Sequence, residues 1–107
     1  MNKLKKIELR VGTIIEVKDF PEAIKSAYQI RVDLGGKIGV KQSSAQITDL
    51  YSKDSLINKQ VIVVTNLPPK KIGPFVSECL ITGFYRDDKK VVLAIPESLV
   101  PNGTLLA

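Results

Sequence analysis

The chain has 107 residues, 44% of them apolar and 25% charged, proportions close to those of an average soluble domain. This length allows one domain, residues 1–107, with a single core that buries roughly two thirds of the unfolded surface. A net charge of +5 indicates an anionic partner such as nucleic acid, although solubility alone would also explain it. No segment approaches the roughly 20 apolar residues of a membrane span, and residues 1–7 lack the apolar run of a signal peptide. We therefore expect a cytoplasmic protein.

Histidine is absent from the sequence, and cysteine occurs once, at Cys79. The lack of histidine excludes histidine-dependent triads, the usual histidine-containing zinc sites and imidazole acid–base chemistry. Cys79 begins an apolar run, which favours a buried, inert thiol. No pair of carboxylates stands in a context typical of catalysis. We expect a protein that is not an enzyme and that uses no metal and no cofactor.

Alternating apolar residues predict three strands in the first half of the chain. Residues 10–17 alternate between two faces, and residues 28–34 place their apolar side chains inward. Gly35-Gly36 predicts a hairpin turn into a third strand over residues 37–42, because glycine takes positive φ without steric cost. Ser43 and Gln46 then have the spacing of a capping box, which predicts a short helix over residues 44–51, with a further turn near residues 54–57.

The second half of the chain predicts further strands separated by loops. Residues 60–65 are apolar on both faces, which indicates a central strand. Residues 66–75 hold three prolines and one glycine and predict a loop, followed by a strand over residues 77–85. A polar run over residues 86–90 predicts a turn into a last strand. Three strands, a helix and then more strands is the order of an OB barrel, so we predict an all-β, five-stranded OB-fold barrel with a short helix between strands 3 and 4 and short terminal elements.

The segment from Lys41 to Gln46 contains the first candidate site for an anion. If Ser43 or Ser44 begins a helix, the free backbone N–H groups and partial positive charge there suit a phosphate. Lys41 and the two hydroxyl groups would complete such a site. The alternative is that the serines only cap the helix and Lys41 is solvated, since serine caps are common.

Residues 66–78 contain the second candidate site. Their prolines hold the backbone extended, so Lys70 and Lys71 are expected on a stiff projection that loses little entropy when it meets a phosphate backbone. In an OB barrel the loop between the fourth and fifth strands commonly contacts the ligand. The alternative is a surface loop whose lysines serve solubility. We expect the two candidate sites to converge on one side of the barrel.

Aromatic residues make up only 6% of the chain, whereas proteins that bind single strands usually stack bases on several of them. Most of the six aromatic residues are predicted in the core, and Phe75, on the loop, is the best candidate for stacking. This composition favours recognition of a folded RNA by its phosphates and its shape.

Three blocks of sequence, residues 10–14 (RVGTI), 41–47 (KQSSAQI) and 66–74 (NLPPKKIGP), resemble a known family. Together with Ser77-Glu78 and residues 100–104, they cover nearly the whole chain in the right order. The chain is similar to the CsaA proteins of the tRNA-binding-domain OB family, which are related to modules of methionyl- and phenylalanyl-tRNA synthetases.

This resemblance implies a homodimer that binds tRNA by overall shape without reading an anticodon. It also implies, as an alternative, a chaperone that binds unfolded or preprotein polypeptides and has an export-related role. Gly12 and Gly73 are implied to shape the backbone, and residues 1–9 to form a short helix or arm at a dimer interface. With no appended domain, any link to a synthetase is expected in trans. The residues implied to contact tRNA are Lys41, Ser43, Ser44, Asn66, Lys70, Lys71, Ser77 and Arg10.

The two ligands require different surfaces. tRNA requires a basic face whose lysines are not neutralised by carboxylates, and its binding should depend strongly on salt. A polypeptide requires an exposed apolar groove, for which Ile72, Pro74 and Phe75 are the candidates. We favour tRNA.

Overall fold

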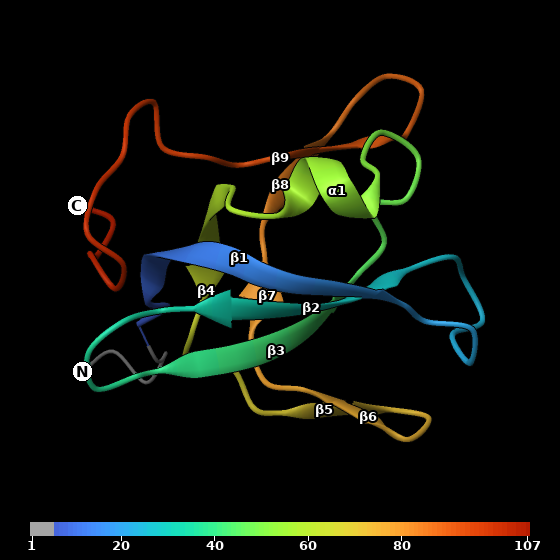
Figure 1. Cartoon of the computed structure of the whole chain (residues 1–107), viewed down its shortest axis with the longest axis horizontal. Coiled ribbons are helices and arrows are strands. Elements are labelled where there is room, and N and C mark those ends of the chain that lie inside the picture. The colour runs from blue at the N-terminus through green and yellow to red at the C-terminus, as the bar shows by residue number, and fades with distance from the viewer. Residues whose placement is uncertain (1–5) are drawn as a thin grey trace.

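The computed structural model describes residues 6–107 as an all-β fold (Figure 1). Five antiparallel strands in the order β3-β2-β1-β4-β7 form a nearly closed barrel of the OB type, and two hairpins, β5–β6 and β8–β9, extend from it. The single helix in these residues, α1, has four residues and is far too short to cross a membrane. In chain order the elements are β1 (Leu9–Asp19), β2 (Tyr28–Asp33), β3 (Val40–Ala45), α1 (Lys53–Leu56), β4 (Gln60–Val64), β5 (Lys70–Ile72), β6 (Phe75–Ser77), β7 (Leu80–Ile81), β8 (Gly83–Tyr85) and β9 (Val91–Leu93).

The alternation predicted for the second strand is confirmed, because Tyr28, Ile30, Val32 and Leu34 are all buried in the core. The strict alternation predicted over residues 10–17 is wrong beyond Ile14. A bulge between Ile14 and Glu16 adds a residue to one strand and shifts the period. Ile14 and Val17 therefore both pack in the core, whereas Ile15 is exposed.

Gly12 is a point of close approach between β1 and β2. A Cβ atom on Gly12 would lie 2.4 Å from Cγ1 of Val32 and 2.8 Å from Cδ2 of Leu34. Any larger residue would have to displace two side chains of the packed core, at a cost of roughly 1–3 kcal/mol. The small residue thus allows β1 and β2 to approach closely.

The short helix predicted between strands 3 and 4 is confirmed, but its predicted range, residues 44–51, is wrong: α1 covers Lys53–Leu56, where only a further turn was expected. Ser43 and Ser44 belong to β3, which pairs with β2 up to Ala45, and the capping box is formed instead by Ser52 and Ser55 at the start of α1. The predicted third strand over residues 37–42 accordingly begins and ends three residues later. The small serines fit a strand here because they lie where β3 meets a neighbouring hairpin, and Ser43 is fully buried.

Residues 66–85 also differ from the predicted loop followed by one strand. Lys70–Ile72 and Phe75–Ser77 pair as the hairpin β5–β6, and the chain then breaks twice before β7 and β8. The polar run over residues 86–90 is the β8–β9 turn, as predicted. Of the predicted N-terminal arm, residues 1–5 lie outside the described part, residues 6–8 have no regular structure, and Leu9 begins β1.

Candidate nucleic-acid interface

The two segments singled out in the sequence lie side by side. Hydrogen bonds join β3 to the base of the β5–β6 hairpin: the backbone N–H of Glu78 donates to the carbonyl oxygen of Gln42 over 2.8 Å, and Nε2 of Gln42 donates to the carbonyl oxygen of Val76 over 2.7 Å. The backbone N–H of Ser44 donates to Oγ of Ser77 over 3.2 Å. The predicted convergence is therefore confirmed, although it occurs between two strands and not at a helix start.

A small apolar cluster fixes the far end of the same hairpin. Phe75 packs against Phe20 with ring centroids 5.3 Å apart, and Ala27 completes the buried cluster, with Ile72 packed against it. Phe20 and Ala27 lie on the loop between β1 and β2, so this loop holds the hairpin tip. Phe75 is buried, so the prediction that its ring is available for base stacking is wrong. The hairpin is held at both ends, which keeps its lysines in place.

The two lysines of the hairpin face opposite ways. Lys70 pairs with Ser77, and Lys71 pairs with Val76. Directly paired residues share a face of a hairpin and neighbouring residues alternate, so Lys70 and Ser77 lie on the face of buried Phe75, toward the barrel. Lys71 and Val76 lie on the outer face. The hairpin therefore presents one lysine to the barrel side and one to the solvent side.

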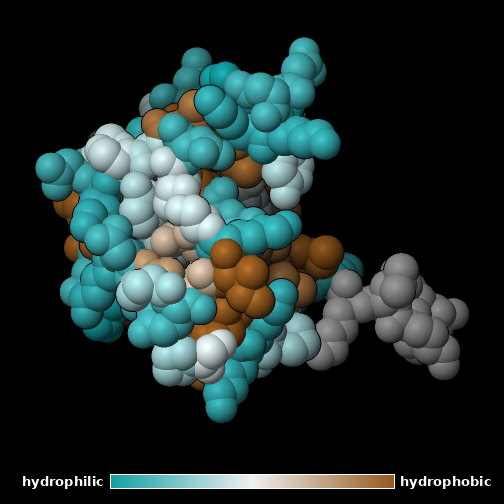
Figure 2. Space-filling model, turned by 90° about the vertical axis from the view of Figure 1, so that its right-hand side faces the viewer, coloured by the Kyte–Doolittle hydropathy of each residue, from teal (hydrophilic) through white to brown (hydrophobic). Residues whose placement is uncertain are grey.

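An open hollow of about 790 Å³ lies between β3, the β5–β6 hairpin and the β8–β9 hairpin. On the face shown in Figure 2, apolar residues gather near the middle of the molecule between more hydrophilic parts. Ser44, Lys70 and Ser77 line the hollow, as does the side of β8. Its remaining lining is largely apolar and comes from residues 45–47, Leu67, Pro68, Ile72, Cys79, Leu80, Ile81, Thr82 and Val91.

The other predicted residues of the first segment lie apart from the hollow's lining. Ser43 is fully buried and its Oγ donates to the carbonyl oxygen of Ser44 over 2.9 Å, so its hydroxyl is occupied inside the barrel. Lys41 is half-buried further back along β3. Within residues 6–107, the side chains of Lys41, Lys70 and Lys71 form no ion pair. Their charges are thus not neutralised by carboxylates of the described chain.

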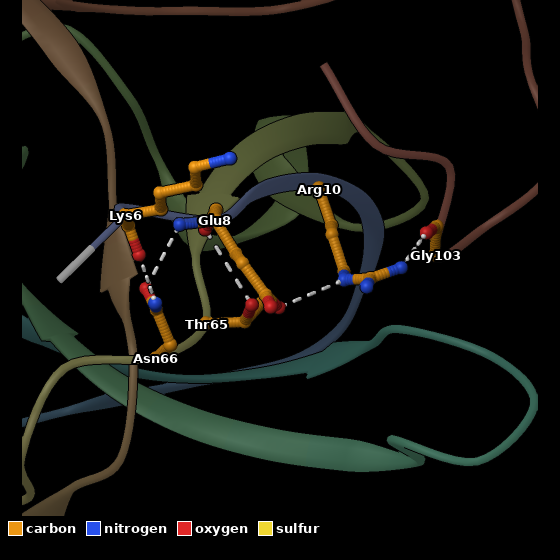
Figure 3. Close-up of polar contacts among 6 residues, drawn as sticks. All are labelled: Lys6, Glu8, Arg10, Thr65, Asn66 and Gly103. Carbon is orange, nitrogen blue, oxygen red and sulfur yellow. Dashed lines mark hydrogen bonds and ion pairs between the residues drawn. The ribbon is translucent and has the colours of Figure 1, made fainter. Parts of the chain in front are cut away.

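Asn66 and Arg10 hold the ends of the chain (Figure 3). Oδ1 of Asn66 accepts the backbone N–H of Glu8 over 2.9 Å, while its Nδ2 donates to the carbonyl oxygen of Lys6. Nη1 of Arg10 donates to the carbonyl oxygen of Gly103 over 2.7 Å, and its Nε lies 3.5 Å from the Glu8 carboxylate. Neither side chain lines the hollow, and both are engaged with the terminal segments.

Two aromatic residues at the hollow were missed by the sequence analysis. Phe84 and Tyr85 on β8 are 67% and 81% exposed, and both line the hollow. The sequence predicts one strand over residues 77–85 and most of the six aromatic residues in the core, and it singles out neither Phe84 nor Tyr85. A signal was present: neighbouring residues of a strand point to opposite faces, so two adjacent aromatics cannot both enter one core.

The thiol of Cys79 lies in the wall of the hollow, where it is buried. Burial raises the pKa of this thiol to about 12, with a further contribution from Glu78. The predicted inert cysteine is consistent with this environment, because the thiolate is the reactive form.

The fold and the hollow define an OB-type barrel with a lysine-bearing hairpin beside its third strand. The sequence family described as "Putative tRNA binding domain" matches residues 9–105. The chain belongs to this family.

Solved structures and curated sequences support this assignment. The chain is 51% identical to the CsaA chaperone protein from Picrophilus torridus, with a TM-score of 0.89, covering 95% of this chain and 92% of that one. Chaperone CsaA from Bacillus anthracis is 40% identical, with a TM-score of 0.88 and coverages of 94% and 91%. Methionine–tRNA ligase from Thermococcus onnurineus is 39% identical over 98 residues, which is 92% of this chain but only 13% of the ligase.

Proposed function

We propose that the protein binds tRNA through the face formed by β3 and the β5–β6 hairpin and acts as a binding module, not as an enzyme, in the cytoplasm. The observation that carries this proposal is the convergence of the two segments, with Lys41, Lys70 and Lys71 free of ion pairs within the described residues. Its membership of a tRNA-binding family supports the same ligand.

Recognition would rest on phosphates and shape. Lys70 offers an ammonium group at the hollow, and Lys71 extends the positive charge over the outer face of the hairpin. The hydroxyl of Ser77 accepts the backbone N–H of Ser44 and donates to the carbonyl oxygen of Cys79, so Ser77 contributes by holding the hairpin against β3. Because the hairpin is held at its base and its tip, little of its freedom is lost on binding. Contacts of this kind position an RNA without reading its sequence, so different tRNAs are expected to bind alike. Asn66 and Arg10 would contribute by fixing the chain ends, and Ser43 by packing.

The double variant Lys70→Ala/Lys71→Ala tests this proposal. Titration with unfractionated tRNA at several salt concentrations should show weaker binding, with the slope of log K against log salt reduced by roughly 1.5–2 for two lost phosphate contacts. The control Lys37→Ala/Lys59→Ala removes the same charge away from the hollow and should change the slope less. Equal slopes for the two double variants would refute the assignment of the hairpin, and no binding by the parent at low salt would refute the function.

We further propose a homodimer formed through the chain ends. Leu106 donates its backbone N–H to the carbonyl oxygen of Leu9, and Leu105 forms a bridge with Arg10. The side chains of Ile7, Leu105 and Leu106 are nevertheless all more than half exposed. Adjacent exposed apolar side chains of this kind are typical of an interface, and a dimer would place two basic faces on one particle and add avidity for one RNA.

Light scattering after gel filtration tests the dimer. Leu106→Asp should shift the parent's dimer mass to that of the monomer, because it places a charge in an apolar contact. Ile24→Asp changes an equally apolar but fully exposed residue on the β1–β2 loop and should leave the dimer intact. A monomeric parent at high micromolar concentration would contradict the proposal.

Polypeptide binding is the second candidate function, because two similar structures are described as chaperones and the hollow has a largely apolar lining. The residues first considered do not form an open groove, since Phe75 is buried and Ile72 packs beside it. The exposed apolar lining comes instead from Leu67, Leu80 and β8. Suppression of aggregation of an unfolded client, unchanged by excess tRNA, would favour this function over RNA binding.

A further inference from the structure

Two large aromatic side chains lie exposed where the hollow meets the β8–β9 hairpin. Phe84 and Tyr85 occupy consecutive positions on β8, and Tyr85 is directly paired with Val91, which packs against the core. Tyr85 therefore lies on the face of the hairpin that is turned toward the barrel, although its own side chain is exposed. The ring lines the hollow and is exposed enough to be reached by a ligand.

The backbone around these rings is held in place. A Cβ atom on Gly83 would lie 2.7 Å from Cγ1 of Val91 and from the carbonyl oxygen of Val92, so the two strands are tightly apposed just before the aromatic pair. The turn that follows is closed by an ion pair of Arg86 with Asp88, which lowers the pKa of the Asp88 carboxyl, and by a backbone bond from Arg86 to Lys90. The aromatic rings are thus presented by a preorganised support.

The chemistry of the hollow fits an unpaired nucleotide. Its volume of about 790 Å³ lies in the range of sites that hold small molecules and cofactors. Its lining includes the aromatic rings of Phe84 and Tyr85, on which any base can stack. Lys70 and the hydroxyl-bearing Ser44 also line the hollow, whereas the hydroxyl of Ser77 is engaged by the backbone of Ser44 and Cys79. An aromatic face and a lysine complement a base and its phosphate respectively.

We infer that the hollow receives a short stretch of unpaired nucleotides of the bound RNA, with a base stacked on Tyr85 or Phe84 and the adjoining phosphate near Lys70. This inference rests on the proposed RNA binding and adds to it a contact that requires single-stranded nucleotides. Phosphate contacts on the hairpin would position the folded RNA, and the hollow would capture an unpaired end or loop.

The tyrosine fluorescence of the intact protein provides a direct test, because the chain has no tryptophan and only three tyrosines. Tyr28 and Tyr51 are tied into internal hydrogen bonds, which leaves Tyr85 as the exposed emitter. Stacking of a base should quench its emission when a tetranucleotide of adenosine, r(AAAA), or unfractionated tRNA is added. The variant Tyr85→Phe should bind both probes as the parent does while losing the quenching.

The variants Tyr85→Leu and Phe84→Leu keep an apolar side chain but remove the aromatic face. Whichever of the two variants removes the ring that stacks on the base should bind r(AAAA) at least about fivefold more weakly than the parent protein. Stacking on an aromatic side chain is worth about 1–3 kcal/mol per base. Ile24→Ala, which removes an exposed apolar group outside the hollow, should bind as the parent does. Unchanged melting temperatures would show that all variants are folded, as expected for exposed positions.

The outcomes separate this inference from the proposed function. If tRNA binds the parent with strong salt dependence but both leucine variants bind tRNA and r(AAAA) as the parent does, the inference is wrong and RNA binding stands. If neither RNA probe binds the parent, the proposed function fails as well. If only an unfolded polypeptide, reduced carboxymethylated lactalbumin, quenches Tyr85, the hollow is a polypeptide site and the inference is overturned.

Discussion

Phe75→Ala is expected to release the tip of the β5–β6 hairpin while leaving the barrel folded. Phe75 is buried against Phe20 and Ala27 in a cluster separate from the main core, and truncation of a buried phenylalanine commonly costs about 3 kcal/mol or more. This substitution should mainly weaken the local packing of the hairpin against the β1–β2 loop, and not the packing of the main core. Native-state hydrogen exchange should therefore show faster exchange of the amides of Lys70–Ser77, while the amides of β1, β2 and β4 keep their protection.

The variant Val76→Ala provides the matched control for this prediction. Val76 lies on the same strand but on the outer face, where it is partly exposed, and exposed substitutions usually change stability by less than about 0.5 kcal/mol. The control should leave exchange and tRNA affinity close to those of the parent. Phe75→Ala should also weaken tRNA binding, because a mobile hairpin loses entropy when it binds. Unchanged exchange in Phe75→Ala would mean that the prolines alone make the hairpin stiff.

Much of the barrel could be predicted from the sequence because its strands carry a local signal. The inward residues of β2 alternate without interruption, and Gly35 and Gly36, both at positive φ, mark the turn that follows. The apolar stretch of β4 correctly predicted a central strand, since β4 lies between β1 and β7. These features depend on neighbours in sequence, so periodicity reveals them.

The position of the helix could not be predicted in the same way, because two pairs of residues, each beginning with a serine, have the spacing of a capping box. Ser43 with Gln46 and Ser52 with Ser55 both have the spacing, and the choice depends on whether the preceding residues pair with another strand. Ser44 belongs to β3 because its backbone is bonded to β2 and to Ser77. The contact between Ser44 and Ser77, which are more than thirty residues apart in sequence, helps to decide which pair begins the helix. No local sequence pattern reveals this contact.

The residues of the candidate site could be named from the sequence, but the direction in which each side chain points could not, because it also depends on strand pairing. Sequence identified Lys70, Lys71, Ser44 and Ser77, which the fold brings close together, but it could not tell that Lys70 faces the barrel and Lys71 the solvent. That distinction requires the register of a hairpin that had been predicted as a loop. Asn66 likewise lies in a family motif, and only the structure shows both ends of its side chain engaged by residues 6–8.

Cys79 is expected to react with iodoacetamide at pH 8 about a hundredfold to a thousandfold more slowly in the folded protein than in the chain unfolded by guanidinium. Burial raises the pKa of its thiol to about 12, so far less of the reactive thiolate is present at pH 8 than in the unfolded chain. Buried Cys79 packs where Glu78 is bonded to Gln42, at the junction that closes the barrel. Alkylation followed by mass spectrometry measures both rates, and a folded rate within tenfold of the unfolded one would show that the junction between β3 and the hairpin opens readily. Since Ser44 and Ser77 are bonded to each other at the same junction, a slow reaction would also mean that this wall of the hollow is in place before any RNA arrives.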